Sequence, residues 1–172
     1  DSKITQYLSS KCDSRLIWGG DQTINHVRNF QLPVRSIDIT FADRYSICII
    51  DSKKILKLNS NGLSKLAESF YNDTFLMDQN ACSSPHLIFW IGKEKEDAKT
   101  KFWRELEFIV EKLYNIDSIN IIDKYTKFCH AAIEIDSDIN LYRFNNLIYR
   151  IELDSIPENI HELKANCGYF YE

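Results

Sequence analysis

Two short apolar runs constrain the fold of this chain more than any other feature. Residues 45–50 form one run and residues 87–91 the other, which Gly92 ends. Runs of this length between chain-breaking residues predict strands buried on both faces, as parallel strands are. Between them, apolar residues recur at helical intervals from 62 to 76. A strand, a helix and a second strand in this order predict an α/β layered fold.

The same alternation continues on both sides of this segment. Before it, we expect a short helix around Ile4, a strand at 15–18, a helix that Asp21 caps and Pro33 ends, and a strand at 34–41. After it, we expect a long amphipathic helix at 98–113, a helix at 119–130, strands at 141–144 and 147–153, and a helix after Pro157. The chain therefore predicts a mostly parallel sheet flanked by helices.

Composition and charge argue against several functional classes. The 44% of hydrophobic residues suffices for one substantial core, and 25 acidic and 21 basic residues are mixed along the chain, so we expect no nucleic-acid partner. No run of about 18 apolar residues occurs and the N-terminus lacks a secretory pattern, so we expect no membrane span and no export. The 5 cysteines fit neither a disulfide framework nor a metal site. We therefore expect free thiols in the cytosol and no bound metal.

A polar loop of small residues holds the most informative cysteine. Residues 77–86 lie between the predicted helix and the strand at 87–91, and they contain Cys82. A thiolate attacks a thioester only where the sulfur is reachable and the oxyanion meets donors; the small Ala81 and Ser83 let backbone N–H groups approach. The alternative is that Cys82 serves packing, as most free cysteines do. His86 is a weaker candidate for its base, because no third group is identified to orient it.

Four segments carry a family resemblance. Residues 78–85 (DQNACSSP), 17–21 (IWGGD), 38–46 (DITFADRYS) and the tail 147–170 resemble, in order and spacing, the acyl-CoA reductases of bacterial luminescence operons (LuxC-like). These enzymes belong to the aldehyde dehydrogenase superfamily. The resemblance implies an aldehyde-dehydrogenase-like catalytic domain with Cys82 as nucleophile and Gly19, Gly20 and Asp21 at the cofactor. It also implies that 1–33 end a nucleotide-binding domain and that 34–172 form the catalytic cysteine domain with a returning segment.

One departure from the hydrolytic relatives suggests the type of reaction. Those enzymes carry a water-activating glutamate in the strand that aligns with residues 37–44, and Thr40 stands in its place here. A threonine cannot act as a general base at neutral pH. The resemblance therefore implies that water attacks acyl-Cys82 slowly and that hydride from a nicotinamide releases the aldehyde. Asp38, on the same strand face, is an alternative base, although a strand aspartate more often anchors a turn.

The function expected from this resemblance is reduction of a long-chain fatty acyl-CoA, or of an acylated carrier protein, to the aldehyde. NADPH is the expected cofactor, with NADH as the alternative. A cysteine-dependent acyltransferase and a non-catalytic interaction domain stay open, as does assembly into a homo-oligomer or an acyl-transfer complex. The chain lacks Gly-x-Gly-x-x-Gly, so we expect a fragment of a longer protein that is inactive by itself. Residues 93–101 predict a solvated helix start, with a CoA phosphate patch as the alternative.

Overall fold

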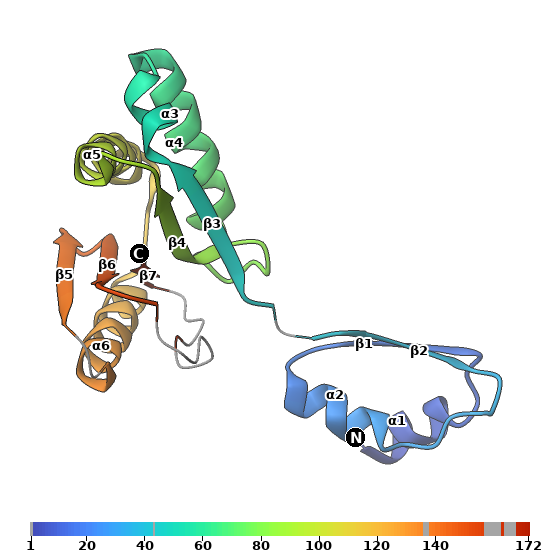
Figure 1. Cartoon of the computed structure of the whole chain (residues 1–172). Coiled ribbons are helices and arrows are strands. Elements are labelled where there is room, and N and C mark those ends of the chain that lie inside the picture. The colour runs from blue at the N-terminus through green and yellow to red at the C-terminus, as the bar shows by residue number, and fades with distance from the viewer. Residues whose placement is uncertain (1, 43, 136–137, 157–162, 164–167) are drawn as a thin grey trace. The chain divides into compact units, whose positions relative to one another are not determined.

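The chain divides into two compact units, Asp1–Arg44 and Tyr45–Glu172 (Figure 1). The computed structural model describes residues 2–42, 44–135, 138–156, 163 and 168–172. The division falls later than the domain boundary expected after residue 33. The reason is that β2 (Ile37–Phe41) pairs in parallel with β1 (Ser14–Trp18) and so belongs to the first unit.

The first unit combines this strand pair with α1 (Ser2–Ser9) and α2 (Asp21–Arg28). Its buried apolar side chains are Ile17 on β1 and Ile24 on α2. The prediction that Asp21 caps α2 is wrong. Gly20 is the N-cap, with an extended backbone at φ −65° and ψ 163°, because Asp21 already lies within the helix.

The second unit is built on a five-stranded sheet in the order β3-β4-β7-β6-β5. The strands are β3 (Ser46–Asp51), β4 (Pro85–Ile91), β7 (Phe170–Tyr171), β6 (Ile148–Leu153) and β5 (Ile139–Phe144). The first four run parallel, and β5 is antiparallel to β6. The helices are α3 (Ser52–Lys57), α4 (Ser60–Thr74), α5 (Lys95–Leu113) and α6 (Ser118–Glu134). This arrangement confirms the predicted α/β fold with a mostly parallel sheet.

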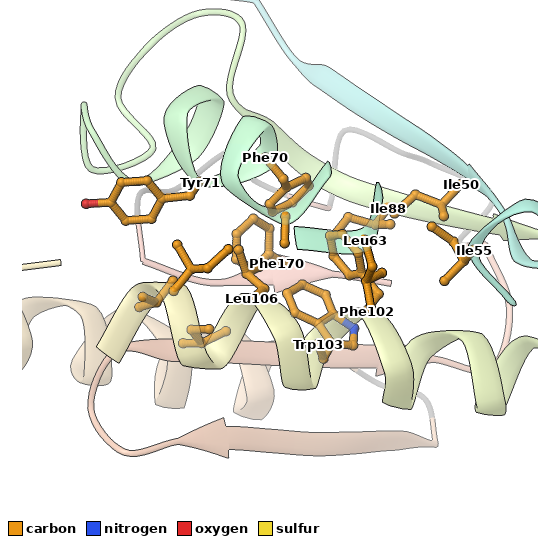
Figure 2. Close-up of a cluster of buried hydrophobic side chains, with 14 of the residues drawn as sticks. Ile50, Ile55, Leu63, Phe70, Tyr71, Ile88, Phe102, Trp103, Leu106 and Phe170 are labelled. Carbon is orange, nitrogen blue, oxygen red and sulfur yellow. The ribbon is translucent and has the colours of Figure 1, made fainter. Parts of the chain in front are cut away.

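The sheet is buried against hydrophobic clusters on both faces. The first cluster joins α3, α4 and α5 to the sheet, and Figure 2 shows Phe70 and Trp103 next to Phe170 of β7. The second cluster packs α6 on the other face. Because side chains alternate along a strand, Ile88 enters the first cluster and its neighbour Leu87 the second. Burial on both faces explains the continuous apolar run of β4 and confirms that prediction.

The corresponding prediction for β3 is wrong. Ile47 and Ile49 keep 49% and 62% of their surface exposed, whereas Cys48 and Ile50 pack on the first cluster. β3 stands at the edge of the sheet, and the second cluster does not include its residues. An apolar run therefore identified the strand but not the number of faces that this unit covers.

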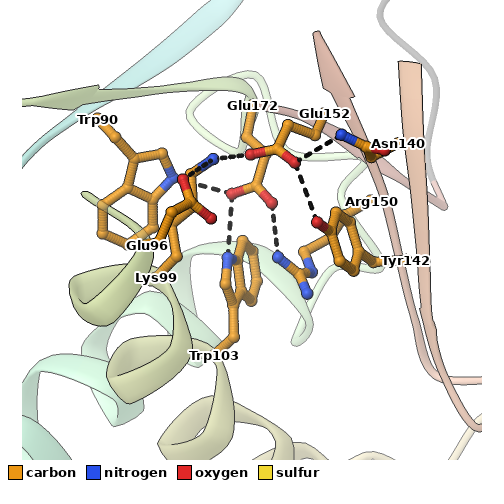
Figure 3. Close-up of polar contacts among 9 residues, drawn as sticks. All are labelled: Trp90, Glu96, Lys99, Trp103, Asn140, Tyr142, Arg150, Glu152 and Glu172. Atoms are coloured by element: carbon orange, nitrogen blue, oxygen red, sulfur yellow. Dashed lines mark hydrogen bonds and ion pairs between the residues drawn. The ribbon is translucent and has the colours of Figure 1, made fainter. Parts of the chain in front are cut away.

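A buried carboxylate joins three strands of the sheet to α5 (Figure 3). The side chain of Glu172, 0% exposed, accepts hydrogen bonds from the indole N–H groups of Trp90 at 2.8 Å and Trp103 at 3.0 Å. Arg150 of β6 pairs with its other oxygen at 2.5 Å. Lys99 of α5 pairs nearby with Glu152. Bonds of this charged kind stabilise more than neutral ones, so the contacts of Glu172 with Trp90, Trp103 and Arg150 hold the end of β7 in place.

One helix was not predicted, and one predicted helix lies outside the described residues. The sequence did not predict α3, which begins where the Asp51 carboxylate accepts a hydrogen bond from the backbone N–H of Lys54 at 3.2 Å. The helix expected after Pro157 lies outside the described residues. Within the described ranges, none of the helices combines the length and the apolar character that crossing a membrane requires.

Candidate active site

Cys82 lies on an exposed turn between α4 and β4. Its carbonyl oxygen accepts a hydrogen bond from Ser46 Oγ at 2.7 Å. Ser84 Oγ donates to the carbonyl oxygen of Asp73 at 2.6 Å, and Ser84 N–H donates to that of Ala81 at 2.9 Å. The loop is thus tied to the start of β3 on one side and to the end of α4 on the other.

The backbone reverses direction shortly before Cys82. Asp78 and Gln79 both have left-handed conformations, with φ of 53° and 59°. Residues other than glycine seldom adopt this region, and each instance needs support from its surroundings. Part of that support is local, since Gln79 N–H donates to the carbonyl oxygen of Thr74 at 2.7 Å and Asp78 N–H to that of Phe75 at 3.1 Å.

The side chain of Asp78 contacts two residues from later helices. Its carboxylate accepts a hydrogen bond from the hydroxyl of Tyr114, next to the end of α5, and forms an ion pair with Lys124 of α6. Lys124 also donates to the Tyr114 hydroxyl, and its side chain is only 3% exposed. A charge this deeply buried is costly unless it is paired, so the contact with Asp78 is strongly favoured.

The side chain of Gln79 is buried and contacts the segment that leads into β7. Its Oε1 accepts a hydrogen bond from Gly168 N–H at 2.7 Å, and its Nε2 donates to the carbonyl oxygen of Tyr169 at 3.3 Å. One amide therefore satisfies both a donor and an acceptor of the facing backbone. These two hydrogen bonds attach the turn before Cys82 to the segment that leads into β7.

Groups near the cysteine differ in their ability to act in catalysis. No hydrogen bond within the described part of the chain engages the backbone N–H of Cys82 or of Ser83, so both could meet an oxyanion. His86 is buried in β4, with its ring 5.7 Å from that of Tyr45. Burial raises the pKa of Tyr45 to about 12, so this phenol stays protonated at neutral pH and cannot serve as a base.

The predicted cofactor residues belong to the first unit, whereas Cys82 belongs to the second. Gly19 N–H donates to the carbonyl oxygen of Phe41 at 3.3 Å, Gly20 caps α2, and Asp21 is exposed in its first turn. No side chain within the described residues caps this helix start. The first backbone N–H groups of α2 therefore remain available to an anion.

Asp38, the alternative base, is engaged by Arg15 of the neighbouring strand. The guanidinium donates from Nη2 at 2.8 Å and from Nε at 3.1 Å to the two carboxylate oxygens. This bidentate bond holds the pKa of Asp38 below its ordinary value. The contact supports the anchoring role over the catalytic one. Thr40, two residues along β2, is half-buried opposite Ile17 of β1.

Several residues of this site were not identified from the sequence. Nothing in the sequence around Ser46 indicated its hydrogen bond to the carbonyl oxygen of Cys82. The sequence did give an indication for Lys124, because this residue occupies the same buried stripe of α6 as Phe128 and Ala131. An ionisable residue at such a position calls for a buried partner. Of the lysines considered for a CoA phosphate, Lys101 instead donates to three backbone carbonyl oxygens between residues 55 and 58.

Cys12, Cys48, Cys82 and Cys129 are free thiols, and Cys167 lies outside the described residues. Among the described histidine, cysteine, aspartate and glutamate residues, no group of three or more is placed to hold a metal ion.

Comparison with known proteins identifies the family. A model of the family described as acyl-CoA reductase (LuxC) matches residues 1–139. The chain belongs to this family. Curated relatives include two proteins named long-chain acyl-protein thioester reductase. The one from Photorhabdus laumondii is 24% identical over 143 residues, and the one from Photorhabdus luminescens is 25% identical over 144 residues. Each match covers 79% of this chain, which spans 28% of each relative.

Solved structures share the fold of this LuxC-family chain. An aldehyde dehydrogenase from Bartonella henselae superposes with a TM-score of 0.60 at 12% identity, over 98% of this chain and 38% of that one. An NADP-dependent glyceraldehyde-3-phosphate dehydrogenase from Bacillus halodurans, complexed with NADP, gives 0.57 at 11% identity, over 99% and 37%. The chain therefore has the aldehyde dehydrogenase fold, as the sequence predicted.

Proposed function

We propose that the protein containing this chain reduces a long-chain acyl thioester to the aldehyde, with Cys82 as the residue that accepts the acyl group. The observation that supports this most is the placement of Cys82. It is exposed on a turn that follows Asp78 and Gln79, which both have left-handed backbones. The Asp78 side chain is held by an ion pair, and the Gln79 side chain is buried and hydrogen-bonded. Strained backbone held by its surroundings is a feature of functional sites.

In the first half of the reaction, the Cys82 thiol gives up its proton to solvent and reacts as the thiolate. The Cys82 thiolate attacks the thioester carbonyl carbon, forming a new C–S bond and an oxyanion. The oxyanion accepts hydrogen bonds from the backbone N–H groups of Cys82 and Ser83. The oxyanion then collapses and the original C–S bond breaks, so CoA or the carrier protein leaves as a thiolate and takes up a proton from solvent. The product is an acyl-enzyme at Cys82.

The second half requires a nicotinamide cofactor, which we propose is NADPH, with NADH as the alternative. A bound reduced nicotinamide supplies the hydride that releases the acyl group as an aldehyde. The start of α2 fits a phosphate of this cofactor, because Gly19 and Gly20 permit close approach and the first N–H groups lack a side-chain cap. Asp21 would accept a hydrogen bond from a hydroxyl group, since its charge disfavours contact with phosphate.

We propose that the acyl-enzyme survives because nothing at the aligned position activates water. Thr40 stands where hydrolytic relatives place their glutamate, and Asp38 is held by Arg15. The acyl donor, an acyl-CoA or an acylated protein, is part of the proposal, as are the cytosolic setting and any assembly with further copies or acyl-transfer partners. Because the chain spans 28% of the curated relatives, we expect the 172 residues alone to be inactive.

Acyl labelling of the protein at its full encoded length tests the proposal. Incubation with hexadecanoyl-CoA, without nicotinamide, should attach one acyl group at Cys82. The Cys82→Ala variant should remain unlabelled, whereas Cys48→Ala should label as the parent does, since burial raises the pKa of the Cys48 thiol. Labelling that persists in Cys82→Ala would refute the assignment. Transfer of the acyl group to another thiol, with no aldehyde formed on adding NADPH or NADH, would indicate an acyltransferase.

A further inference from the structure

Two buried side chains anchor the turn before Cys82: Lys124 of α6, and Gln79 of the turn itself, which bonds to the distant residues Gly168 and Tyr169. We propose that Lys124 and Gln79 are positioning residues, which hold Cys82 in place for acyl transfer. This inference rests on the proposed role of Cys82 as the nucleophile. Neither residue needs to touch the substrate, because each acts on the backbone that carries the cysteine.

Lys124 acts through Asp78. Its ammonium group pairs with the Asp78 carboxylate and donates to the Tyr114 hydroxyl, which donates in turn to the same carboxylate. Lys124, Asp78 and Tyr114 each contact the other two, so each side chain orients its partners. Asp78 has φ of 53°, a left-handed conformation that residues other than glycine seldom adopt without support from their surroundings. The ion pair supplies part of this support and selects one conformation of the turn.

Gln79 acts through the backbone of the returning segment. Its amide bonds to Gly168 N–H and to the Tyr169 carbonyl oxygen, and its side chain is buried. β7 follows directly and is paired with β4 and β6. The two hydrogen bonds of Gln79 therefore connect the cysteine turn to the central strand of the sheet.

Gly168 brings the two anchors together. A Cβ atom placed on Gly168 would lie 2.7 Å from Lys124 Cγ and 3.1 Å from its Cα, so the segment packs directly on α6 at Lys124. The same residue donates the hydrogen bond to Gln79. Lys124, Gly168 and Gln79 thus form one continuous contact beneath the turn. A shift of one anchor would be transmitted to the other and to Cys82.

Positioning of this kind predicts a loss in rate with little loss in binding. A displacement of about 1 Å of a reacting atom can lower a rate by roughly 10²-fold. Loss of a stabilising contact far from the cysteine would lower the melting temperature without this effect on the rate. Lys99 of α5 provides the matched comparison, because it is also a helical lysine paired with a carboxylate, Glu152, and its side chain is largely buried.

The experiment compares Lys124→Met, Gln79→Glu and Lys99→Met in the protein at its full encoded length. The measurement is the rate of Cys82 acylation by hexadecanoyl-CoA at saturation, with the concentration giving half of that rate. We expect Lys124→Met and Gln79→Glu to lower the saturated rate roughly tenfold to a hundredfold while changing the half-saturating concentration less than about twofold. Lys99→Met should lower the melting temperature and leave the rate within about twofold.

A double-mutant cycle tests the route through Asp78. If Lys124 acts by holding Asp78, adding Lys124→Met to Asp78→Asn should lower the rate far less than adding it to the parent. Additive losses would refute this route.

The possible outcomes separate this inference from the proposed function. Failure of the parent to acylate at Cys82 would refute the proposed function. Normal acylation at Cys82 in the parent and in folded Lys124→Met and Gln79→Glu would refute only the positioning roles, as would an equal loss in Lys99→Met. If Lys124→Met does not fold, Gln79→Glu decides, because a carboxylate has the shape of the amide but lacks the donor that Tyr169 requires.

Discussion

At the residue scale, Gly168 occupies a position that no other residue should tolerate. Its φ is +126°, and an added Cβ would overlap the side chain and backbone of Lys124. We expect Gly168→Ala to destabilise the protein by roughly 1–3 kcal/mol, the usual cost of overpacking, and to slow acylation of Cys82. Thermal unfolding and the acylation rate measure both effects.

Gly62→Ala is the control for this prediction, because Gly62 lies in α4 with no unusual φ. A Cβ there would lie 3.2 Å from Asn59 Oδ1 and from Leu58 Cδ2, and its next neighbour, Leu58 Cβ, would be at an ordinary 3.9 Å. This variant should stay within about 1 kcal/mol of the parent. Equal stability of the Gly168→Ala and Gly62→Ala variants would contradict the packing described at α6.

Thr40 provides a test of why the proposed enzyme is a reductase. In the protein at its full encoded length, Thr40→Glu should place a carboxylate where hydrolytic relatives have theirs and speed hydrolysis of acyl-Cys82. General-base assistance is worth about 10²-fold, so the change is measurable as lost label over time and as a lower yield of aldehyde. A well-folded Thr40→Glu protein whose label decays as slowly as that of the parent would show that water access, or a different alignment, explains the stability of the intermediate.

At the scale of elements, the β1–β2 pair should lose stability in acid through Asp38. Arg15 lowers the pKa of Asp38 in the folded state, so this carboxylate contributes stability above its unfolded pKa of about 3.9 and loses it as pH falls through the folded value. Asp38→Asn should therefore destabilise the pair by about 1–3 kcal/mol at pH 7. The difference should shrink as pH falls through the lowered pKa of folded Asp38, because the parent carboxyl then also becomes neutral.

Hydrogen exchange of the Ser14–Trp18 amides between pH 2 and 7 would measure this difference. The Arg28→Gln variant is a suitable control, because Arg28 is largely exposed and its Nε comes no closer than 3.8 Å to the Asp38 carboxylate. Surface pairs of that kind contribute little, so its effect should be small at every pH. If the difference in stability between the parent and Asp38→Asn stays constant with pH, the pH dependence does not come from the Asp38 carboxylate.

Most elements followed from local patterns. The helices α4 and α5 and the strand β4 were predicted, because an apolar stripe or an apolar run between breakers is a property of neighbouring residues. The short helix α3 was missed, since six residues carry too little periodicity and its cap at Asp51 follows a strand directly. The exposure of β3 was predicted wrongly, because its sequence does not indicate its place in the sheet.

At the scale of the whole molecule, the second unit should fold by itself. Both hydrophobic clusters consist only of residues after Tyr45, and the described contacts of Trp90 and Trp103 lie within the same unit. We expect residues 45–172 alone to unfold in one cooperative transition that coincides by circular dichroism and by tryptophan emission. A gradual change without a transition would show that the first 44 residues are needed for the core.

The amino-acid sequence by itself determined the fold class, the family and the loop that carries Cys82. Each depends on residues close together in the chain, either a repeating apolar pattern or a short motif. Only the tertiary structure decided what holds that loop, because the partners are far apart: Gln79 and Gly168 are separated by 89 positions, and Trp90 and Glu172 by 82. A buried lysine such as Lys124 can be recognised as needing a partner from its place in an apolar stripe. Which partner it finds depends on how the strands and helices pack.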